Sequence, residues 1–187
     1  MYMNAINDGK NGKRKKYQVI YADPPWRYNF SKSKSRKIEN HYPTMSLESI
    51  CNLSIPFDDN AVLYLWATSP KLLEALKVMS AWGFEYKSHA IWDKGKVGMG
   101  YWFRGQHELL LVGVRGKFSP PVASSRISSV IYEKRGVHSV KPSFIRDLIS
   151  NWYSNYNKLE LFARGKCEGW DVWGNEVESD IEIGIDC

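Results

Sequence analysis

The sequence has few cysteines and no long apolar run, and both shortages narrow the classes of protein to which it can belong. Its three cysteines are Cys51, Cys167 and Cys187, and their spacing fits neither a zinc motif nor a disulfide framework. We therefore expect a reducing compartment such as the cytoplasm. No apolar run approaches membrane-spanning length and no secretory signal is present, so we expect no membrane partner.

Two further absences concern catalytic chemistry. The chain has no glycine-rich phosphate loop, which argues against a phosphate-binding site. It also has no zinc signature, which argues against a deaminase. The nearest carboxylate–histidine pair is His107-Glu108, and adjacent residues of a strand point to opposite faces. We therefore predict that no metal is required.

The charge of the chain is unevenly distributed. Its formal net charge is +6 over 187 residues, a length that suits one domain with a substantial core. Residues 1–37 hold ten lysines and arginines against two acids, and residues 176–187 hold five acids and no base. We predict a flexible basic arm over 1–16, a folded domain over 17–176 and a solubilising acidic tail over 177–187. The arm either attracts a polyanion or is merely solvated.

Apolar strands alternate with helices along the chain, which predicts an α/β fold with a mainly parallel sheet flanked by helices. One short helix is expected after Ser46, a second is capped by Ser69 and stopped by Gly83, and a third spans residues 142–153. The expected strands are residues 17–22, 61–67, 84–92, 108–114, 129–132 and 159–163.

The most unusual stretch follows the first strand. Asp23-Pro24-Pro25-Trp26, called the DPPW motif below, stands at the carboxyl end of that strand, where α/β sheets bind ligands. Neither proline has an N–H, so the ladder ends there and both proline carbonyls are expected to be free acceptors. Asp23 adds an anionic acceptor and Trp26 a stacking face. Arg164 follows the last predicted strand, and it frames one crevice with Asp23 if the two strands are neighbours.

Such a corner suits a planar base with an exocyclic amino group, as in adenine or cytosine. That amino group is a weak nucleophile because its lone pair is delocalised into the ring. Hydrogen bonds accepted by Asp23 and by the Pro24 carbonyl would direct the lone pair at a carbon held roughly 3–3.5 Å away. Only an unpaired or flipped base reaches such a pocket. The residue types do not choose the electrophile.

Two loops accompany the motif. Residues 27–45 are rich in serine and lysine and contain several aromatics, so we predict an active-site loop that clamps the phosphates beside the base. Residues 94–104 are rich in glycine and aromatics. Their 99–103 part either serves a partner subunit, faces the substrate or belongs to the core, and a homodimer is left open.

A series of short motifs continues the pattern. They are Tyr42-Pro43-Thr44-Met45-Ser46, Leu63-Tyr64-Leu65-Trp66, Ile91-Trp92-Asp93-Lys94, His107-Glu108 with Leu111-Val112-Gly113-Val114-Arg115-Gly116, His138-Ser139 with Lys141-Pro142, Glu160-Leu161-Phe162-Ala163-Arg164, and Gly174-Asn175. With the DPPW motif, and over residues 17–176, they resemble the S-adenosylmethionine-dependent N6-adenine methyltransferases, in the branch typified by the catalytic subunit of the mRNA N6-methyladenosine writer (the MT-A family).

The resemblance implies a Rossmann-like methyltransferase fold in permuted order, with the catalytic motif ahead of most of the cofactor-binding half. It implies S-adenosylmethionine as the cofactor and nucleic acid as the partner. The residues implied as catalytic are Asp23, Pro24, Pro25 and Trp26. Those implied to contact the cofactor are Asp23, Lys141, Phe162, Arg164 and Asn175. Those expected to contact the substrate are Trp26, Arg27, Tyr42 and Lys94, with Tyr42 in a loop that closes over the base.

The chain also departs from the family. The glycine cluster of the cofactor site is reduced to Phe162-Ala163-Arg164-Gly165, and Glu176 stands where the mRNA-writer branch has an amide. We expect no counterpart of the long zinc-finger extension of that branch. The form is then similar to compact prokaryotic and phage members that act on DNA, so we favour N6-adenine in DNA and the cytoplasm of a prokaryotic or phage-infected host cell. RNA N6-adenosine, N4-cytosine and a non-catalytic nucleic-acid-binding role on the same fold are the alternatives.

Overall fold

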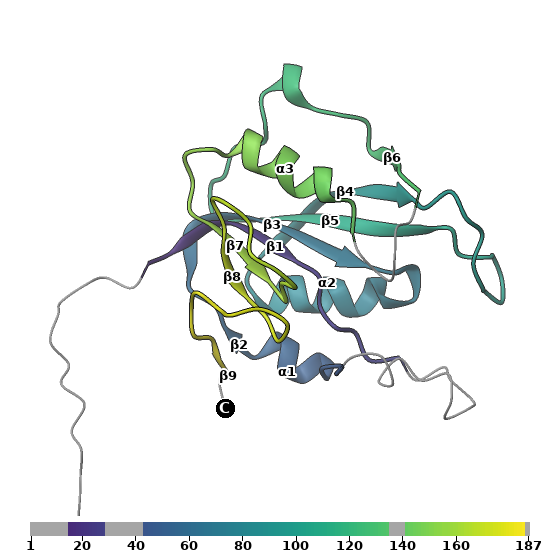
Figure 1. Ribbon diagram of the computed structural model, residues 1–187, viewed down its shortest axis with the longest axis horizontal. Helices are drawn as coiled ribbons and strands as arrows, with labels where there is room; N and C mark the ends of the chain where they lie inside the picture. The colour runs from purple at the N-terminus through teal and green to yellow at the C-terminus, as the bar shows by residue number, and fades with distance from the viewer. Residues whose placement is uncertain (1–14, 29–42, 135–140, 186–187) are drawn as a thin grey trace, which may run out of the picture.

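The computed structural model describes residues 15–28, 43–134 and 141–185, and in these ranges the chain has an α/β architecture (Figure 1). None of the helices in these ranges has the length and apolar character that a bilayer crossing needs. The elements, in chain order, are β1 Tyr17–Ala22, α1 Leu47–Cys51, β2 Leu53–Ser54, β3 Phe57–Ala67, the 3-10 turn η3 Ser69–Lys71, α2 Leu72–Ala81, β4 Glu85–Asp93, β5 His107–Arg115, the 3-10 turn η4 Ala123–Ser125, β6 Val130–Tyr132, α3 Ser143–Trp152, β7 Lys158–Leu161, β8 Asp171–Trp173 and β9 Gly184–Ile185.

Seven of the strands form one sheet in the order β6-β4-β5-β3-β1-β7-β8. β1 is parallel to both of its neighbours, β3 and β7, with Ala22 opposite Leu65 and Leu161. The mainly parallel sheet is thus confirmed, with one exception. β5 runs antiparallel to β3 and to β4, so its amino end at His107 lies at the same edge as the carboxyl ends of β1, β3 and β4.

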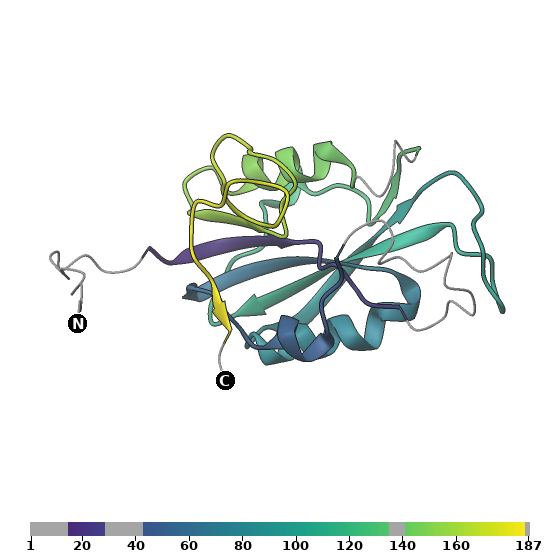
Figure 2. The ribbon, with the colours of Figure 1, turned by 60° about the horizontal axis from the view of Figure 1, so that its bottom comes forward.

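Helices cover both faces of the sheet, with α1 and α2 on one side and α3 on the other (Figure 2). β1 shows why both covers are needed. Ile20 and Ala22 belong to the core that includes α1 and α2, whereas Val19 and Tyr21 belong to the core beneath α3. Successive side chains of a strand point to opposite faces, so a strand such as β1, which is apolar at every position except Gln18, must be buried on both.

Helix boundaries follow local signals, except at the start of α2. Ser46 caps α1 by accepting a hydrogen bond from the Ser49 N–H at 3.0 Å. Gly83 follows α2 with a φ of 78°, which stops the helix as predicted. The predicted Ser69 cap is wrong, because Ser69 begins the 3-10 turn η3 and its hydroxyl lies 3.2 Å from His107 Nε2. Thr68 occupies the cap position of that turn without a side-chain hydrogen bond.

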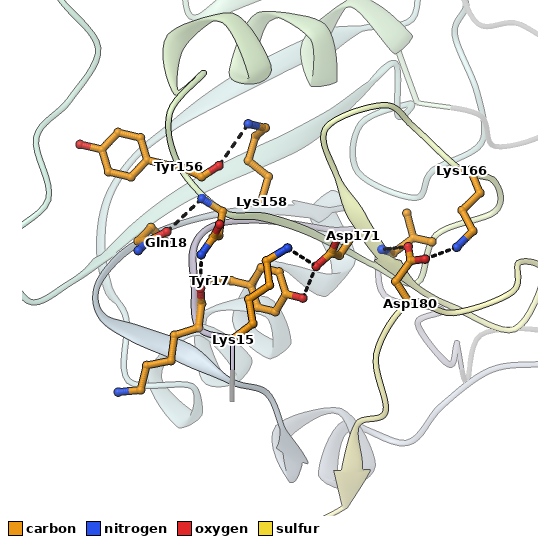
Figure 3. Close-up of polar contacts among 11 residues, drawn as sticks. Lys15, Tyr17, Gln18, Tyr156, Lys158, Lys166, Asp171 and Asp180 are labelled. Atoms are coloured by element: carbon orange, nitrogen blue, oxygen red, sulfur yellow. Dashed lines mark hydrogen bonds and ion pairs between the residues drawn. The ribbon is translucent and has the colours of Figure 1, made fainter. Parts of the chain in front are cut away.

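The last described residues fold against the domain, which corrects the expectation of a merely solubilising tail. β9 pairs antiparallel with β2, and Ile181 and Ile183 pack on the core that contains α1 and α2. Asp180 pairs with Lys166 (Figure 3) and accepts a hydrogen bond from the Val172 N–H at 2.9 Å. Asp180 therefore helps to hold this segment against β8.

Only the end of the predicted basic arm is described. Lys15 forms an ion pair of 2.6 Å with Asp171 of β8, and the Tyr17 hydroxyl donates to the same carboxylate (Figure 3). These contacts join the start of β1 to β8 across the intervening strand β7. Residues 1–14 of the arm and residues 186–187 of the tail lie outside the described residues.

Candidate active site

A pocket of about 200 Å³ opens at the edge of the sheet where β1, β3 and β7 end. Its walls come from parts of the chain that are distant in sequence. β1 and β7 are neighbours, so the predicted crevice between Asp23 and Arg164 is confirmed. The site residues predicted from the sequence that line this pocket are Asp23, Pro24, Pro25, Trp26, Lys141, Phe162, Arg164 and Asn175.

The DPPW motif leaves the sheet directly after β1. The Pro24 carbonyl accepts a hydrogen bond from the Trp26 N–H at 2.8 Å, and the Pro25 carbonyl accepts one from the Met45 N–H at 3.0 Å. The expectation that both proline carbonyls are free is therefore wrong. A carbonyl oxygen has two lone pairs, so the Pro24 carbonyl retains the capacity for a second donor.

Trp26 is more buried than expected for a side chain whose ring face was predicted to stack on a base. It is 5% exposed and belongs to the core that contains α1 and α2. Its indole N–H donates to the Trp66 carbonyl at 3.2 Å, so both the apolar body and the polar edge of the ring are satisfied within the protein. The sequence suggested an openly presented face; the structure shows a ring anchored in the wall of the pocket, which holds the motif in place.

Four charged side chains form a continuous series through the site. Lys141 Nζ lies 2.6 Å from Asp23 Oδ2 and 3.5 Å from Glu108 Oε2. Lys94 Nζ lies 3.2 Å from Glu108 Oε1. The four side chains are between 13% and 26% exposed, so their attraction is screened less than that of surface pairs.

The two carboxylates control the protonation of Lys141. Burial by itself would lower the pKa of its ammonium, but Asp23 and Glu108 outweigh that effect and raise the pKa above its ordinary value. Lys141 is therefore a fixed positive charge at neutral pH. It engages Oδ2 of Asp23, and among the described residues no hydrogen bond reaches Oδ1.

The turn after β7 forms the facing wall. Phe162 has a φ of 61°, a left-handed conformation that costs a residue with a Cβ about 1 kcal/mol. Its ring packs edge-on against Trp173, with the ring centroids 5.5 Å apart. Backbone strain of this kind collects at ligand sites, where the surrounding structure enforces it.

The end of β8 closes on the same turn. A Cβ on Gly174 would lie 2.1 Å from the Ala163 carbonyl oxygen, so only glycine permits this approach. The following residues, Asn175 and Glu176, then reach the pocket. Glu176 Oε1 lies 3.6 Å from Arg164 Nε, so an acid stands beside the cation expected to face the cofactor.

A second cavity, of about 240 Å³, adjoins the first on the side of α3. Glu160 and Arg146 line it and form an ion pair of 2.6 Å. Burial raises the pKa of the Glu160 carboxyl, and Arg146 offsets part of that rise. The residues that line both cavities are Asp23, Lys141, Phe162 and Arg164. The two spaces therefore meet around the Asp23–Lys141 pair.

Two of the predicted substrate contacts, Arg27 and Lys94, do not line the pocket. Arg27 is exposed, and its Nε lies 3.4 Å from Thr44 Oγ1. Lys94 reaches the site only through Glu108. Tyr42 lies outside the described residues, as do residues 29–41 of the same loop. Their contacts with a substrate stay predictions.

Glu108 lines the pocket although it was not among the predicted site residues; the sequence marked it only as part of the His107-Glu108 motif. In a sheet assumed to be parallel, the start of a strand lies at the edge opposite the ligand site, and only the reversal of β5 brings Glu108 to the pocket. The sequence did not reveal that β5 pairs antiparallel with its neighbours, and this pairing is what places Glu108 at the pocket. Across the described ranges, no group of three or more His, Cys, Asp and Glu side chains is placed to hold a metal ion.

Known proteins match almost the whole chain. The family model MT-A70 matches residues 17–176. The chain is 37% identical to the type II methyltransferase M.MunI of a Mycoplasma species, over 91% of this chain and 82% of that protein. It is 28% identical to the N(6)-adenosine-methyltransferase subunit METTL3 of Danio rerio and 29% identical to the N(6)-adenine-specific methyltransferase METTL4 of Homo sapiens, but it spans only 28% and 38% of those two proteins.

Proposed function

The chain belongs to the MT-A70 family of N6-adenine methyltransferases, and we propose that it methylates adenine in DNA at the pocket beside the DPPW motif, with S-adenosylmethionine as methyl donor. One observation carries the choice of site. Asp23 and Lys141 are 118 positions apart, yet they pair at 2.6 Å in a pocket that Arg164 and Asn175 also line. Chemically distinct groups from distant segments converge there.

The choice of DNA rests on the match to M.MunI. Type II methyltransferases modify DNA, and the 37% identity to M.MunI extends over most of both chains. The formal net charge of +6 favours a polyanionic substrate. The motif order supports a permuted methyltransferase fold, because β1 with the DPPW motif precedes β7 and its cofactor-side turn in the chain. The cytoplasm of a prokaryotic cell is the compartment in which we propose that it acts.

The pocket residues fit the chemical groups of S-adenosylmethionine. Lys141 and Arg164 are the cations for its carboxylate and hydroxyls, and the Asn175 amide suits the ribose hydroxyls. Phe162 and Trp173 provide aromatic surface for the adenosine side. When bound, the cofactor supplies a methyl group on a sulfonium, which passes to the amino nitrogen with release of a neutral thioether.

The DPPW motif prepares the amino group of the target adenine. Asp23 Oδ1 accepts one N–H, and the second lone pair of the Pro24 carbonyl accepts the other. Both bonds draw the nitrogen lone pair out of conjugation and fix its direction. Lys141 holds Oδ2 of Asp23 at 2.6 Å, which leaves Oδ1 to face the base. After transfer the nitrogen loses a proton, which Asp23 passes to water at its partly exposed side.

The test is methylation of sheared genomic DNA that lacks N6-methyladenine, with S-adenosylmethionine as donor. The DNA is digested and its nucleosides are identified by mass. We expect N6-methyldeoxyadenosine. N4-methyldeoxycytidine as the product, or methylation of RNA and not DNA in a parallel reaction, would overturn the choice of substrate. No methylation together with no calorimetric binding of S-adenosylmethionine would indicate a non-catalytic nucleic-acid-binding partner.

Asp23→Asn tests the mechanism, because it keeps the shape of the side chain and removes its charge. We expect a loss of methylation of about 100-fold or more, while the affinity for S-adenosylmethionine stays near the wild-type value. Asp59→Asn is the matched control, because Asp59 lies near the start of β3, away from the pocket, with its side chain 83% exposed. Full activity of Asp23→Asn would refute the mechanism.

A further inference from the structure

The hairpin that joins β4 to β5 carries exposed apolar side chains that the proposed reaction does not use. Met99 is 86% exposed, Tyr101 90%, Trp102 96% and Phe103 91%; we call these four residues the aromatic tip. Side chains of this size are usually buried, and a contiguous exposed apolar patch marks an interaction site. Figure 2 shows the hairpin projecting well beyond the sheet.

Backbone contacts hold the tip in a closed turn. The Gly98 N–H donates to the Gly105 carbonyl at 2.8 Å, and the Gly105 N–H donates to the Met99 carbonyl at 3.0 Å. Arg104 Nε donates to the Gly98 carbonyl at 2.9 Å. A Cβ on Gly98 would lie 2.7 Å from the Gly105 carbonyl oxygen. The exposed rings are thus presented on an ordered support, which lowers the entropic cost of binding a partner.

The base of the hairpin reaches the active site. Lys94, the first residue after β4, pairs with Glu108 at the start of β5, and Glu108 also pairs with Lys141 in the pocket. β4 and β1 run in the same direction, so the hairpin leaves the sheet at the edge where the pocket opens. A polymer that places a base in the pocket therefore lies on the side of the molecule from which the tip projects.

The charge of the hairpin indicates the kind of partner. Residues 94–106 contain Lys94, Lys96 and Arg104 and no acid. Aromatic rings between cations suit a nucleic acid, because the cations neutralise phosphates and every base offers a face for stacking. A second copy of the chain would have to bury these cations against a surface of matching negative charge.

We propose that the aromatic tip stacks on bases of the DNA that presents the target adenine, next to the position that the adenine leaves. The proposal rests on the proposed function, because it needs DNA as the substrate. Taking a base out of a duplex costs its stacking. Apolar side chains that enter the base stack replace part of that loss and hold the strand open.

The test compares DNA binding by the wild type and by a variant with Tyr101→Ala, Trp102→Ala and Phe103→Ala. Binding to sheared genomic duplex DNA is measured at several salt concentrations, beside methylation and S-adenosylmethionine binding. We expect the dissociation constant for DNA to rise roughly tenfold or more. The slope of log K against log salt stays unchanged because no charge is removed, and cofactor affinity is unaffected.

Two further variants distinguish the effect of base stacking on DNA binding from the effect of positive charge and from the effect of removing any exposed aromatic side chain. Lys96→Ala should reduce the salt slope by about one unit. Tyr86→Ala removes an aromatic side chain that is 41% exposed near the opposite end of β4, and it should bind and methylate DNA like the wild type. Trp102→Ala alone serves if the triple variant does not fold, and it should show a smaller loss in the same direction.

Unchanged DNA affinity and methylation in the triple variant would overturn the proposal. It would also be overturned if light scattering showed a dimeric wild type and a monomeric variant, with DNA affinity lost only together with the dimer, since the tip would then bind a second copy. A wild type that methylates no DNA rejects the proposed function itself. Wild-type methylation of DNA with an unaffected triple variant rejects only the role of the tip.

Discussion

Lys141→Met removes the ammonium that lies between two carboxylates and keeps most of the side-chain volume. At an effective dielectric constant of about 20, the gross attraction is about 6 kcal/mol at the 2.6 Å contact with Asp23 and about 5 kcal/mol at the 3.5 Å contact with Glu108. The cost of burying the charges cancels most of this. We expect a net loss of about 2 kcal/mol in the free energy of unfolding, the usual worth of hydrogen bonds to charged groups.

Urea unfolding at several pH values measures this loss. The folded-state pKa of Lys141 is raised above its unfolded value of about 10.4. Its contribution is therefore fully present below about pH 10.4 and is lost as the pH rises through the folded-state pKa. The difference between wild type and Lys141→Met should be constant from neutral pH to about pH 10 and should shrink above it.

Glu108→Gln is the matched control, because it weakens the longer contact and leaves the shorter one intact. It should destabilise the protein less than Lys141→Met does, and it should leave the pairing with Asp23 in place. If Lys141→Met is as stable as the wild type, or if its deficit does not shrink at high pH, the ammonium does not hold the two carboxylates together as described.

Three further sets of substitutions test two positions in the pocket walls and the cap of α1. Phe162→Gly should be more stable in urea than Phe162→Ala by about 1 kcal/mol, because both lack the ring but only alanine keeps a Cβ at a φ of 61°; equal stabilities would contradict the strain. Gly174→Ala should lower the melting temperature by several degrees, since its Cβ meets the Ala163 carbonyl, whereas Gly184→Ala, with nothing within 4 Å, should not. Ser46→Ala should cost about 1 kcal/mol in thermal unfolding through loss of the α1 cap.

The local sequence pattern predicted much of the fold, because strand burial and helix ends depend on residues within a short stretch of the chain. Every residue of the strand at 17–22 except Gln18 is apolar, and the strand is buried on both faces, as its composition indicates. Gly83 ends α2 because glycine tolerates the positive φ that stops a helix. Ser69 misled the prediction, because a serine before a proline fits a helix cap and the first turn of a 3-10 segment equally well, and the side chain found His107 instead.

Contacts between segments that are distant in the sequence were not predicted from the local sequence pattern. The Pro25 carbonyl of the DPPW motif accepts a hydrogen bond from the N–H of Met45, at the far end of the 27–45 loop. The acids after residue 176 read as a solubilising tail, yet Asp180 binds Lys166 and the backbone of β8. Each of these outcomes depends on which segments become neighbours, and composition carries no information about that.

The sequence by itself determined which residues are candidates for the site. The DPPW motif and Arg164 were identifiable from residue types and strand ends, Lys141, Phe162 and Asn175 were implied by the family resemblance, and all line one pocket. Tertiary structure alone decided their electrostatics. The reversal of β5 carries Glu108 to the carboxyl edge of β1, where it shares Lys141 with Asp23. The direction of a strand depends on its pairing with the other strands of the sheet, whereas the functional groups of a side chain depend only on the identity of that residue.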